Sequence, residues 1–215
     1  MKPMPIVISA PSGGGKSTLC DRLLQDYPEI VYSVSCTTRE PRGSEEDGID
    51  YHFLSRAAFD RLVADKAFLE HAEVHGNGYG TLVAPIREAF AEGLSVILDI
   101  DVQGAGQIRD YLKALPGNDP LRIRFVDIFI MPPSLEVLRA RLEARGEDSP
   151  ETIERRMKNA QDEIAKANQY RFRILNDDLD AAYRDLCGIL DAMDGVAGEA
   201  DRRAREAEKG EGERP

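Results

Sequence analysis

The chain has 215 residues, of which 42% are hydrophobic and 31% charged, a composition that suits one globular domain with insertions. Its net charge of −11 argues against a general binder of nucleic-acid backbones. No segment approaches the roughly 20 apolar residues that a membrane span requires, and the apolar run 6–10 is too short for a signal-peptide core. Three widely spaced cysteines, Cys20, Cys36 and Cys187, predict free thiols and a cytoplasmic location.

The first predicted elements are a strand, a turn and a helix. Residues 5–9 form a short apolar run, which is typical of a strand buried on both faces of a parallel sheet. A glycine-rich turn follows, and a helix is expected over 16–26, ended by Pro28. Residues 31–36 are expected to form another strand.

The turn between this strand and helix matches the phosphate-binding P-loop pattern. Its glycines allow backbone N–H groups to point at phosphate oxygens, and the start of the helix adds further donors. Lys16 would contact the β- and γ-phosphates of a nucleoside triphosphate, and the Ser17 hydroxyl would bind Mg²⁺. The alternative is a flexible glycine-rich turn, but the flanking strand and helix favour the P-loop. The predicted triphosphate-binding residues are Ala10, Pro11, Ser12, Gly13, Gly14, Gly15, Lys16, Ser17 and Thr18, with Ala10 where the pattern has a glycine.

An arginine-rich segment, 33–53, follows the second strand. Arg39 and Arg42 flank a proline, and Tyr51 lies nearby. Guanidinium groups bind phosphate through paired hydrogen bonds and a phenol adds a donor, so these side chains can clamp a phosphate dianion. A solvated charged loop is the alternative.

Strands are also expected over 95–99 and 125–130, with helices around 85–92 and 103–112. This alternation predicts a parallel α/β sheet. Asp99 ends a buried strand, where a carboxylate could hold Mg²⁺ together with Ser17; a helix-capping acid is the alternative.

Two helices are predicted between 134 and 166. Ser134 is a candidate N-cap, Gly146 a candidate terminator, and Ser149 begins the second helix. Paired helices joined by a short charged turn suit a mobile lid. The last segment, 195–215, is charged and poor in large apolar residues, which favours a flexible tail that is either a frayed helix or disordered.

The sequence closely resembles the guanylate kinases over about residues 5–190. The P-loop, the 33–42 segment, and shorter motifs around Asp50, Glu70, Tyr79, Asp99, Pro132 and Asn176 occur in that family's order. The resemblance implies a P-loop NTPase-type parallel core over 1–36, 82–133 and 167–194, an inserted β-rich GMP-binding region over 37–81, and a helical lid over 134–166.

The resemblance also implies residue roles. It places the GMP phosphate on Arg39, Arg42, Tyr51 and Tyr79, with Glu45 orienting the arginines. It places the guanine among Ser35, Glu70, Thr81 and Asp101, and it makes Arg141, Arg145 and Arg156 of the lid transition-state clamps that act with Lys16. Solvated ion pairs with Glu136, Glu143 and Glu154 are the alternative for these three arginines.

The chemistry of the proposed base site fits guanine. Guanine offers N1–H and N2–H₂ as donors and O6 as acceptor, which complement the Glu70 carboxylate and the Ser35 hydroxyl; adenine would leave such groups unpaired. Two departures from the family pattern stand out. Gly43 comes one place early before Glu45, and Gly78 replaces an aromatic residue, which is expected to loosen a wall near the nucleotide.

The expected partners are ATP with Mg²⁺ and GMP, with dGMP as a further candidate acceptor, and neither nucleic acid nor membrane. The oligomeric state is not indicated. Two alternatives remain, an inactive module that binds a protein partner and a P-loop kinase for another monophosphate. The intact Lys16 and Ser17 speak against the first, and Ser35 and Glu70 speak against the second.

Overall fold

The apolar strand at the N-terminus lies in the middle of a five-stranded parallel sheet. In the computed structural model, which describes residues 1–146 and 148–211 and side chains to residue 195, the strand order is β2-β7-β1-β8-β9. Every neighbouring pair is parallel, and Ile8 of β1 is in register with Asp99 of β7. The strands are β1 Pro5–Ser9, β2 Ile30–Tyr32, β7 Ser95–Asp99, β8 Val126–Met131 and β9 Phe172–Leu175.

Apolar residues on both faces of the strands divide the core into two layers, because successive side chains of a strand point to opposite faces. Ile6 and Ile8 pack on one face with α1 (Lys16–Asp26) and α8 (Leu179–Glu211). Val7 packs on the other face against the remaining core helices. These are α3 (Val83–Ala91), α4 (Val102–Ala114), α5 (Pro120–Ile123) and the 3-10 turn η1 (Ala167–Gln169).

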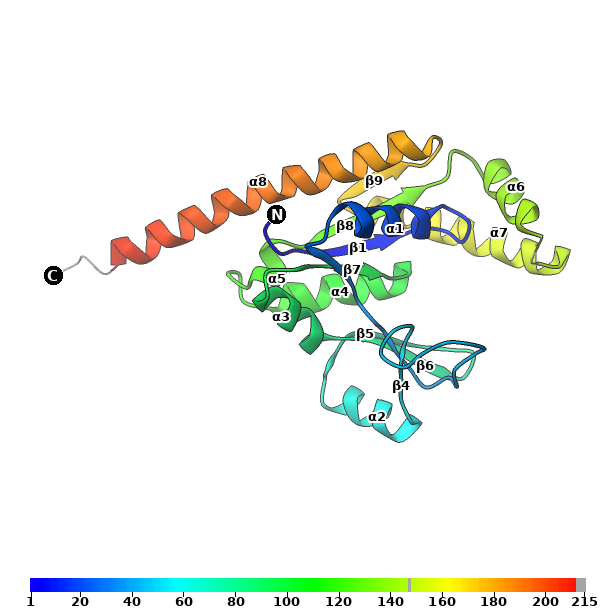
Figure 1. Cartoon of the computed structure of the whole chain (residues 1–215), viewed down its shortest axis with the longest axis horizontal. Coiled ribbons are helices and arrows are strands. Elements are labelled where there is room, and N and C mark those ends of the chain that lie inside the picture. Colours follow the sequence, from blue (N-terminus) through cyan, green and yellow to red (C-terminus); the bar gives the residue numbers. More distant parts are fainter. Residues whose placement is uncertain (147, 212–215) are drawn as a thin grey trace.

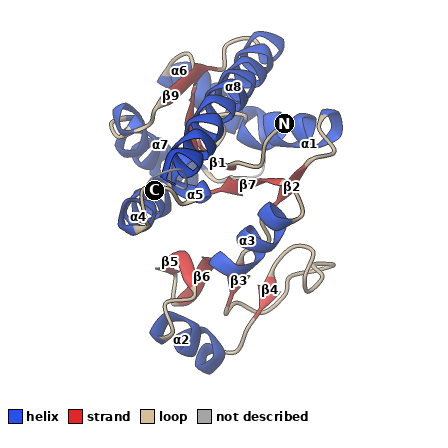
Figure 2. Ribbon diagram, turned by 90° about the vertical axis from the view of Figure 1, so that its left-hand side faces the viewer, coloured by secondary structure: helices blue, strands red, loops and turns tan. Residues whose placement is uncertain are grey.

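A second, smaller sheet lies to one side of the core (Figure 1; Figure 2). It has the order β4-β3-β6-β5 and mixes parallel and antiparallel pairs. Its apolar centre joins Cys36 and Phe68 to Phe59 of α2. The elements are β3 Cys36–Thr37, β4 His52–Phe53, α2 Arg56–Ala64, β5 Phe68–Val74 and β6 Asn77–Leu82.

Two further helices form a hairpin at the right-hand end of the core in Figure 1. They are α6 (Leu135–Arg145) and α7 (Pro150–Ile164). The last helix, α8, runs across the core and continues as helix to Glu211. The flexible tail predicted for 195–215 thus has a helical backbone as far as 211, and residues 212–215 lie outside the described ones.

The carboxyl ends of the parallel strands meet at one edge of the large sheet. The P-loop follows β1, Asp99 ends β7, the α6–α7 hairpin predicted to be a lid follows β8, and Asn176 follows β9. In open parallel sheets, ligands bind at this edge. The topology therefore gathers the predicted triphosphate-binding residues there.

The strand predicted over 31–36 is wrong as a single element. Residues 30–32 form β2 in the large sheet, and 36–37 form β3 in the small one. The connecting residues leave the large sheet after Ser33, whose N–H still donates to the carbonyl of Ile97 at 2.9 Å. One short stretch of strand-forming residues can contribute its first part to one sheet and its last part to another. The periodicity of the sequence does not show where the chain passes between the sheets.

Among the helices of the described residues, none combines the length and apolar character that a membrane-spanning segment requires. Cys20 and Cys36 are buried, Cys187 is partly buried, and all three are free thiols, as predicted.

One buried ion pair joins α4 to the start of β8. Arg109 Nη1 lies 2.8 Å from Asp127 Oδ2, and the backbone N–H of Arg171 donates to the other carboxylate oxygen at 3.0 Å. Asp127 is only 4% exposed. Removing one partner of such a pair leaves an uncompensated buried charge.

We therefore predict that Arg109→Ala lowers the free energy of unfolding by about 3 kcal/mol. Lys113→Ala on the same helix, which removes only the exposed pair with Asp110, is the matched control and should cause little change. Urea denaturation of both variants checks this. If the two variants have equal free energies of unfolding, the pair with Asp127 contributes no more to stability than an exposed ion pair.

Candidate functional site

The P-loop wraps the start of α1 in the conformation that its glycines allow. The N–H of Gly14 donates to the carbonyl of Pro11 at 2.8 Å, and Gly15 has φ 89° directly before the helix. A Cβ atom at Gly15 would lie 2.2 Å from Asn176 Nδ2, so only glycine fits there. Ala10, the departure from the pattern, is partly buried against the core, and its Cβ lies 3.1 Å from the place a Gly14 Cβ would take.

A cavity of about 400 Å³ opens at this loop. All nine predicted triphosphate-binding residues line it, which brings that part of the predicted site together. Four charged side chains complete its wall, contributed by β7, the N-cap of α4 and the two helices of the hairpin: Asp99, Asp101, Arg145 and Glu163.

Lys16 and Asp99 form an ion pair across the cavity. The second oxygen of the Asp99 carboxylate accepts a hydrogen bond from the Tyr32 hydroxyl at 2.8 Å. Burial, together with the negative charge of Asp99, raises the pKa of Tyr32, so this phenol stays a donor. Asp99 is thus held by two donors from different elements.

The donor set at this cavity suits a magnesium ion carried by a nucleotide. Ser17 and Asp99 both line the cavity and both offer oxygen atoms, the ligands that Mg²⁺ prefers. Within the described residues, no group of three or more His, Cys, Asp or Glu side chains could hold a metal by itself. Mg²⁺ in such sites takes one or two protein oxygens and completes its shell with phosphates and water.

A second cluster of predicted residues lies beside the small sheet. Arg39 donates to both oxygens of Glu45 at 2.9 Å, and the backbone N–H of Arg42 donates to Glu45 at 2.8 Å. The guanidinium of Arg39 also lies 5.3 Å from the centre of the Tyr51 ring, which meets Tyr79 edge-on at 6.1 Å. The hydrogen bonds from Arg39, followed by that from Arg42, lower the pKa of Glu45.

Glu70 and Thr81 face each other across the β5–β6 pair. The Thr81 hydroxyl donates to Glu70 Oε1 at 2.7 Å, and both side chains are buried. Burial, and to a lesser degree the nearby charge of Asp101, raises the pKa of Glu70, while the Thr81 hydrogen bond lowers it. A Cβ at Gly104 would lie 3.0 Å from the other Glu70 oxygen, so the helix backbone passes close to this carboxylate.

Asp101 stands between the two clusters. Its carboxylate caps α4 by accepting from the N–H groups of Gln103 and Gly104 at 2.9 and 2.8 Å. It also lines the P-loop cavity. Ser35 lies on the segment between β2 and β3, and its carbonyl accepts from the N–H of His52 at 2.9 Å.

The two departures in this region have structural explanations. Gly43 has φ 56° in a turn closed by the N–H of Glu45 on the carbonyl of Arg42 at 3.0 Å, so the early glycine serves that turn. At Gly78, a Cβ would come within 2.7 Å of the Phe59 ring. The Phe59 ring thus fills the space beside Gly78, and the expected loosening of a wall near the nucleotide stays a prediction.

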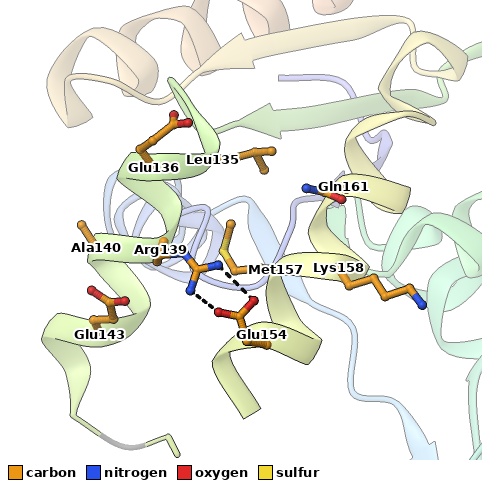
Figure 3. Close-up of a pocket in the computed structure, with 9 residues that line it drawn as sticks. All are labelled: Leu135, Glu136, Arg139, Ala140, Glu143, Glu154, Met157, Lys158 and Gln161. Atoms are coloured by element: carbon orange, nitrogen blue, oxygen red, sulfur yellow. Dashed lines mark hydrogen bonds and ion pairs between the residues drawn. The ribbon is translucent and has the colours of Figure 1, made fainter. Parts of the chain in front are cut away.

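The lid hairpin has its own apolar centre and its own ion pair. Ser134 and Ser149 cap the two helices as predicted, with N–H donors at 3.2 and 3.3 Å, and Gly146 follows α6 with φ 65°. Figure 3 shows Arg139 of α6 and Glu154 of α7 joined across a cavity of about 430 Å³; the two hydrogen bonds measure 2.6 and 3.1 Å. Leu138, Leu142, Ile153, Met157 and Ala160 pack between the helices.

The three predicted lid arginines lie in different surroundings. Arg145 lines the P-loop cavity. Arg141 donates to the carbonyl of Asn176 at 2.9 Å, and Arg156 pairs with Asp148 at 2.9 Å. Only Arg145 therefore faces the cavity in this structure, while Arg141 approaches the P-loop through Asn176.

Four residues that received no role from the sequence belong to these clusters. Asn176 donates its amide to the carbonyl of Gly14 at 2.8 Å, Glu163 lines the cavity, Tyr32 holds Asp99, and Arg139 joins the lid helices. A signal existed for Asn176, because it follows a parallel strand and so reaches the ligand edge of the sheet. The others come from contacts between distant segments.

Comparisons with known proteins agree with this arrangement. The family model described as guanylate kinase matches residues 2–193. The chain is 44% identical to a guanylate kinase of Carboxydothermus hydrogenoformans, with 89% of each chain covered, and 48% identical to one of Neisseria gonorrhoeae, with 86% of each covered.

A crystal structure of guanylate kinase from Anaplasma phagocytophilum is also similar. It has 34% sequence identity and a TM-score of 0.65, and the match covers 89% of this chain and 86% of that one. The P-loop fold class and the resemblance stated from the motifs are confirmed. The chain belongs to the guanylate kinase family of enzymes.

Proposed function

We propose that this chain is a guanylate kinase, which transfers the γ-phosphoryl group of ATP to GMP and yields ADP and GDP. The observation that carries the proposal is the position of Asp101. It lines the P-loop cavity and accepts from the N–H of Gly104, at which a Cβ would lie 3.0 Å from a Glu70 oxygen, so the P-loop cavity and the buried Glu70 carboxylate adjoin each other. One enzyme can then hold donor and acceptor side by side.

On the donor side, the P-loop backbone and Lys16 would hold the β- and γ-phosphates. Lys16 would exchange its contact with Asp99 for phosphate oxygens when ATP arrives. Ser17 and Asp99 would hold Mg²⁺, which neutralises charge on those oxygens when bound. Freed from Lys16, the carboxylate of Asp99 has an oxygen available for the ion or one of its waters.

On the acceptor side, Arg39, Arg42, Tyr51 and Tyr79 would bind the GMP phosphate. Glu45 already fixes the plane of the Arg39 guanidinium with two hydrogen bonds, which prepares its outer face for a phosphate. The guanine would be read by Ser35, Glu70, Thr81 and Asp101. Thr81 supports one oxygen of Glu70 and leaves the other for guanine donors.

No general base is needed for the transfer itself. The second pKa of a phosphate is about 6, so the attacking oxygen is largely ionised at neutral pH. The difficulty is to bring two polyanions together, which positive charge and exclusion of water overcome. Arg145 faces the donor cavity, and Arg141 and Arg156 would join it when the lid closes on both substrates.

The division of the chain follows from these roles. We assign 1–36, 82–133 and 167–194 to the P-loop core, 37–81 to the GMP-binding region, 134–166 to the lid and 195–215 to a charged tail. dGMP remains a candidate acceptor, since none of the roles above involves the ribose 2′-hydroxyl. The three free thiols suit a cytoplasmic enzyme.

The test of the proposed function is ADP production from ATP and Mg²⁺ with each of four acceptors, GMP, AMP, dTMP and CMP. We expect turnover with GMP and at most trace turnover with the others, because only guanine complements Glu70. Activity with AMP but not GMP would overturn the substrate assignment. Absence of activity with all four would favour a binding module.

For the lid, we predict that Arg145→Ala lowers kcat by about 10²-fold or more while the KM for GMP changes by no more than about threefold. The reason is that a cation near the transferring group acts chiefly in the transition state. Arg155→Ala, an exposed arginine of the same hairpin, is the matched control and should keep its kcat. Steady-state kinetics of both variants decide the matter; an unchanged kcat for Arg145→Ala would remove the residue from catalysis.

For the base site, we predict that Glu70→Gln lowers kcat/KM for GMP by about 10²-fold or more, since an amide group places a donor opposite guanine donors. The pKa of Glu70 is raised by burial, so in the parent enzyme GMP affinity should fall on acidification at a higher pH than an exposed glutamate would give. Glu70→Gln should lose this contribution and keep only the pH dependence that comes from the GMP phosphate, whose second pKa is about 6. Initial rates across pH, with Glu73→Gln at the exposed end of β5 as control, provide the check.

A further inference from the structure

Glu163 brings a negative charge from the lid into the P-loop cavity. It lies in the last turn of α7 and lines the cavity together with Lys16, Asp99, Asp101 and Arg145. The side chain is partly buried, whereas its neighbour Asp162 is exposed and is not among the lining residues. A glutamate at the end of a lid helix would ordinarily be solvated. Glu163 instead lines the cavity at the P-loop, so its carboxylate can act on whatever binds there.

The charges around Glu163 show what it experiences. Burial and the charge of Asp101 raise the pKa of Glu163, while Lys16 and Lys166 act in the opposite direction. Lys16 is itself held by Asp99. The cavity thus presents two cations, Lys16 and Arg145, and three carboxylates, an unfavourable balance for a triphosphate that arrives without a metal ion.

A divalent cation bound to the triphosphate offsets the excess of negative charge in this cavity. Phosphate oxygens that approach a carboxylate in a partly buried site are repelled, and the repulsion is screened less than in open water. When Mg²⁺ neutralises part of the triphosphate charge, this repulsion becomes weaker, and the carboxylate is attracted to the ion itself. Because Glu163 belongs to the lid, its energy also depends on whether the lid lies over the phosphates.

We propose that Glu163 is a specificity-determining residue that makes ATP binding depend on a divalent cation: it disfavours metal-free ATP in the cavity and favours the Mg²⁺ complex. The inference rests on the proposed assignment of ATP to the P-loop cavity. It adds to that assignment a carboxylate from the lid that discriminates between two forms of the same nucleotide.

The test is isothermal titration of the full chain with ATP at pH 8, with excess Mg²⁺ and separately with EDTA. We expect Glu163→Gln to lower the ratio of the metal-free Kd to the Mg²⁺ Kd by about tenfold, the order expected for one nearby charge in a partly screened site. Glu163→Asp, which keeps the charge, and Asp162→Asn, which removes an adjacent charge outside the cavity, should keep the parent ratio. If the Kd measured with EDTA changes more, repulsion of metal-free phosphate is the larger effect. If the Kd measured with Mg²⁺ changes more, attraction of the ion is the larger effect.

The inference is overturned if the ratio of the metal-free Kd to the Mg²⁺ Kd in Glu163→Gln stays within about twofold of the parent value. It is also overturned if Asp162→Asn lowers this ratio as much as Glu163→Gln does, since the effect would then come from the overall charge of the protein. Lys16→Ala distinguishes the underlying assignment: if it binds ATP as tightly as the parent under both conditions, the P-loop cavity is not the ATP site. Circular dichroism of each variant establishes that the fold is retained.

Discussion

A buried hydrogen bond from Asn176 to the carbonyl of Gly14 ties the phosphate loop to the rest of the molecule. Asn176 follows β9 at the far end of the sheet order, and its own carbonyl receives Arg141 from the lid. The amide of Asn176 sits where a side chain at Gly15 would stand, so loop conformation and strand position constrain each other. Asn176 therefore joins the loop, the sheet edge and helix α6 at one point.

One cation in each of the two clusters is paired with an acid. Lys16 is held by Asp99, and Arg39 by Glu45. This solves a problem set by the net charge of −11, because a protein rich in carboxylates must present concentrated positive charge to two phosphate-bearing substrates. An acid beside each of these cations orients it and limits its repulsion of neighbouring positive charge. As a consequence, the phosphate of a substrate must compete with the acid for the cation.

The two pairs answer this competition differently. Glu45 uses both oxygens on Arg39 and also accepts from the backbone of Arg42, so it keeps the guanidinium oriented. Arg39 Nη1 also donates to the carbonyl of Glu40 at 2.7 Å, which leaves the Nε–H and one Nη2 hydrogen for phosphate. Lys16 has a flexible stem and no fixed plane, so it can leave Asp99 altogether. An arginine suits the acceptor site, where orientation counts, and a lysine suits the loop, where the cation must move.

Sequence patterns predicted the parts of this molecule that local rules determine. The strand over 5–9, the helix over 16–26 and the serine caps of the lid follow from apolar runs, glycines and capping residues, each of which acts within a few positions. The division of 31–36 between two sheets, the Tyr32 contact with Asp99 and the filling of Gly78 by Phe59 depend on segments far apart in the chain. Glu163 was missed for the same reason, since helical position alone does not show what a side chain faces.

The α6–α7 hairpin carries opposite charges, Arg145 and Glu163, on two helices that are packed together. An apolar centre and the Arg139–Glu154 pair hold α6 and α7 to each other, so a displacement of one helix should carry the other with it. Arg145 and Glu163, one from each helix, both line the P-loop cavity, and in the proposed closure they would enter or leave it together. A lid bearing only arginines would be drawn onto any polyanion, including a triphosphate without its metal or acceptor. Coupling one carboxylate to those arginines lets the net charge of the bound ligands decide whether closure is favourable.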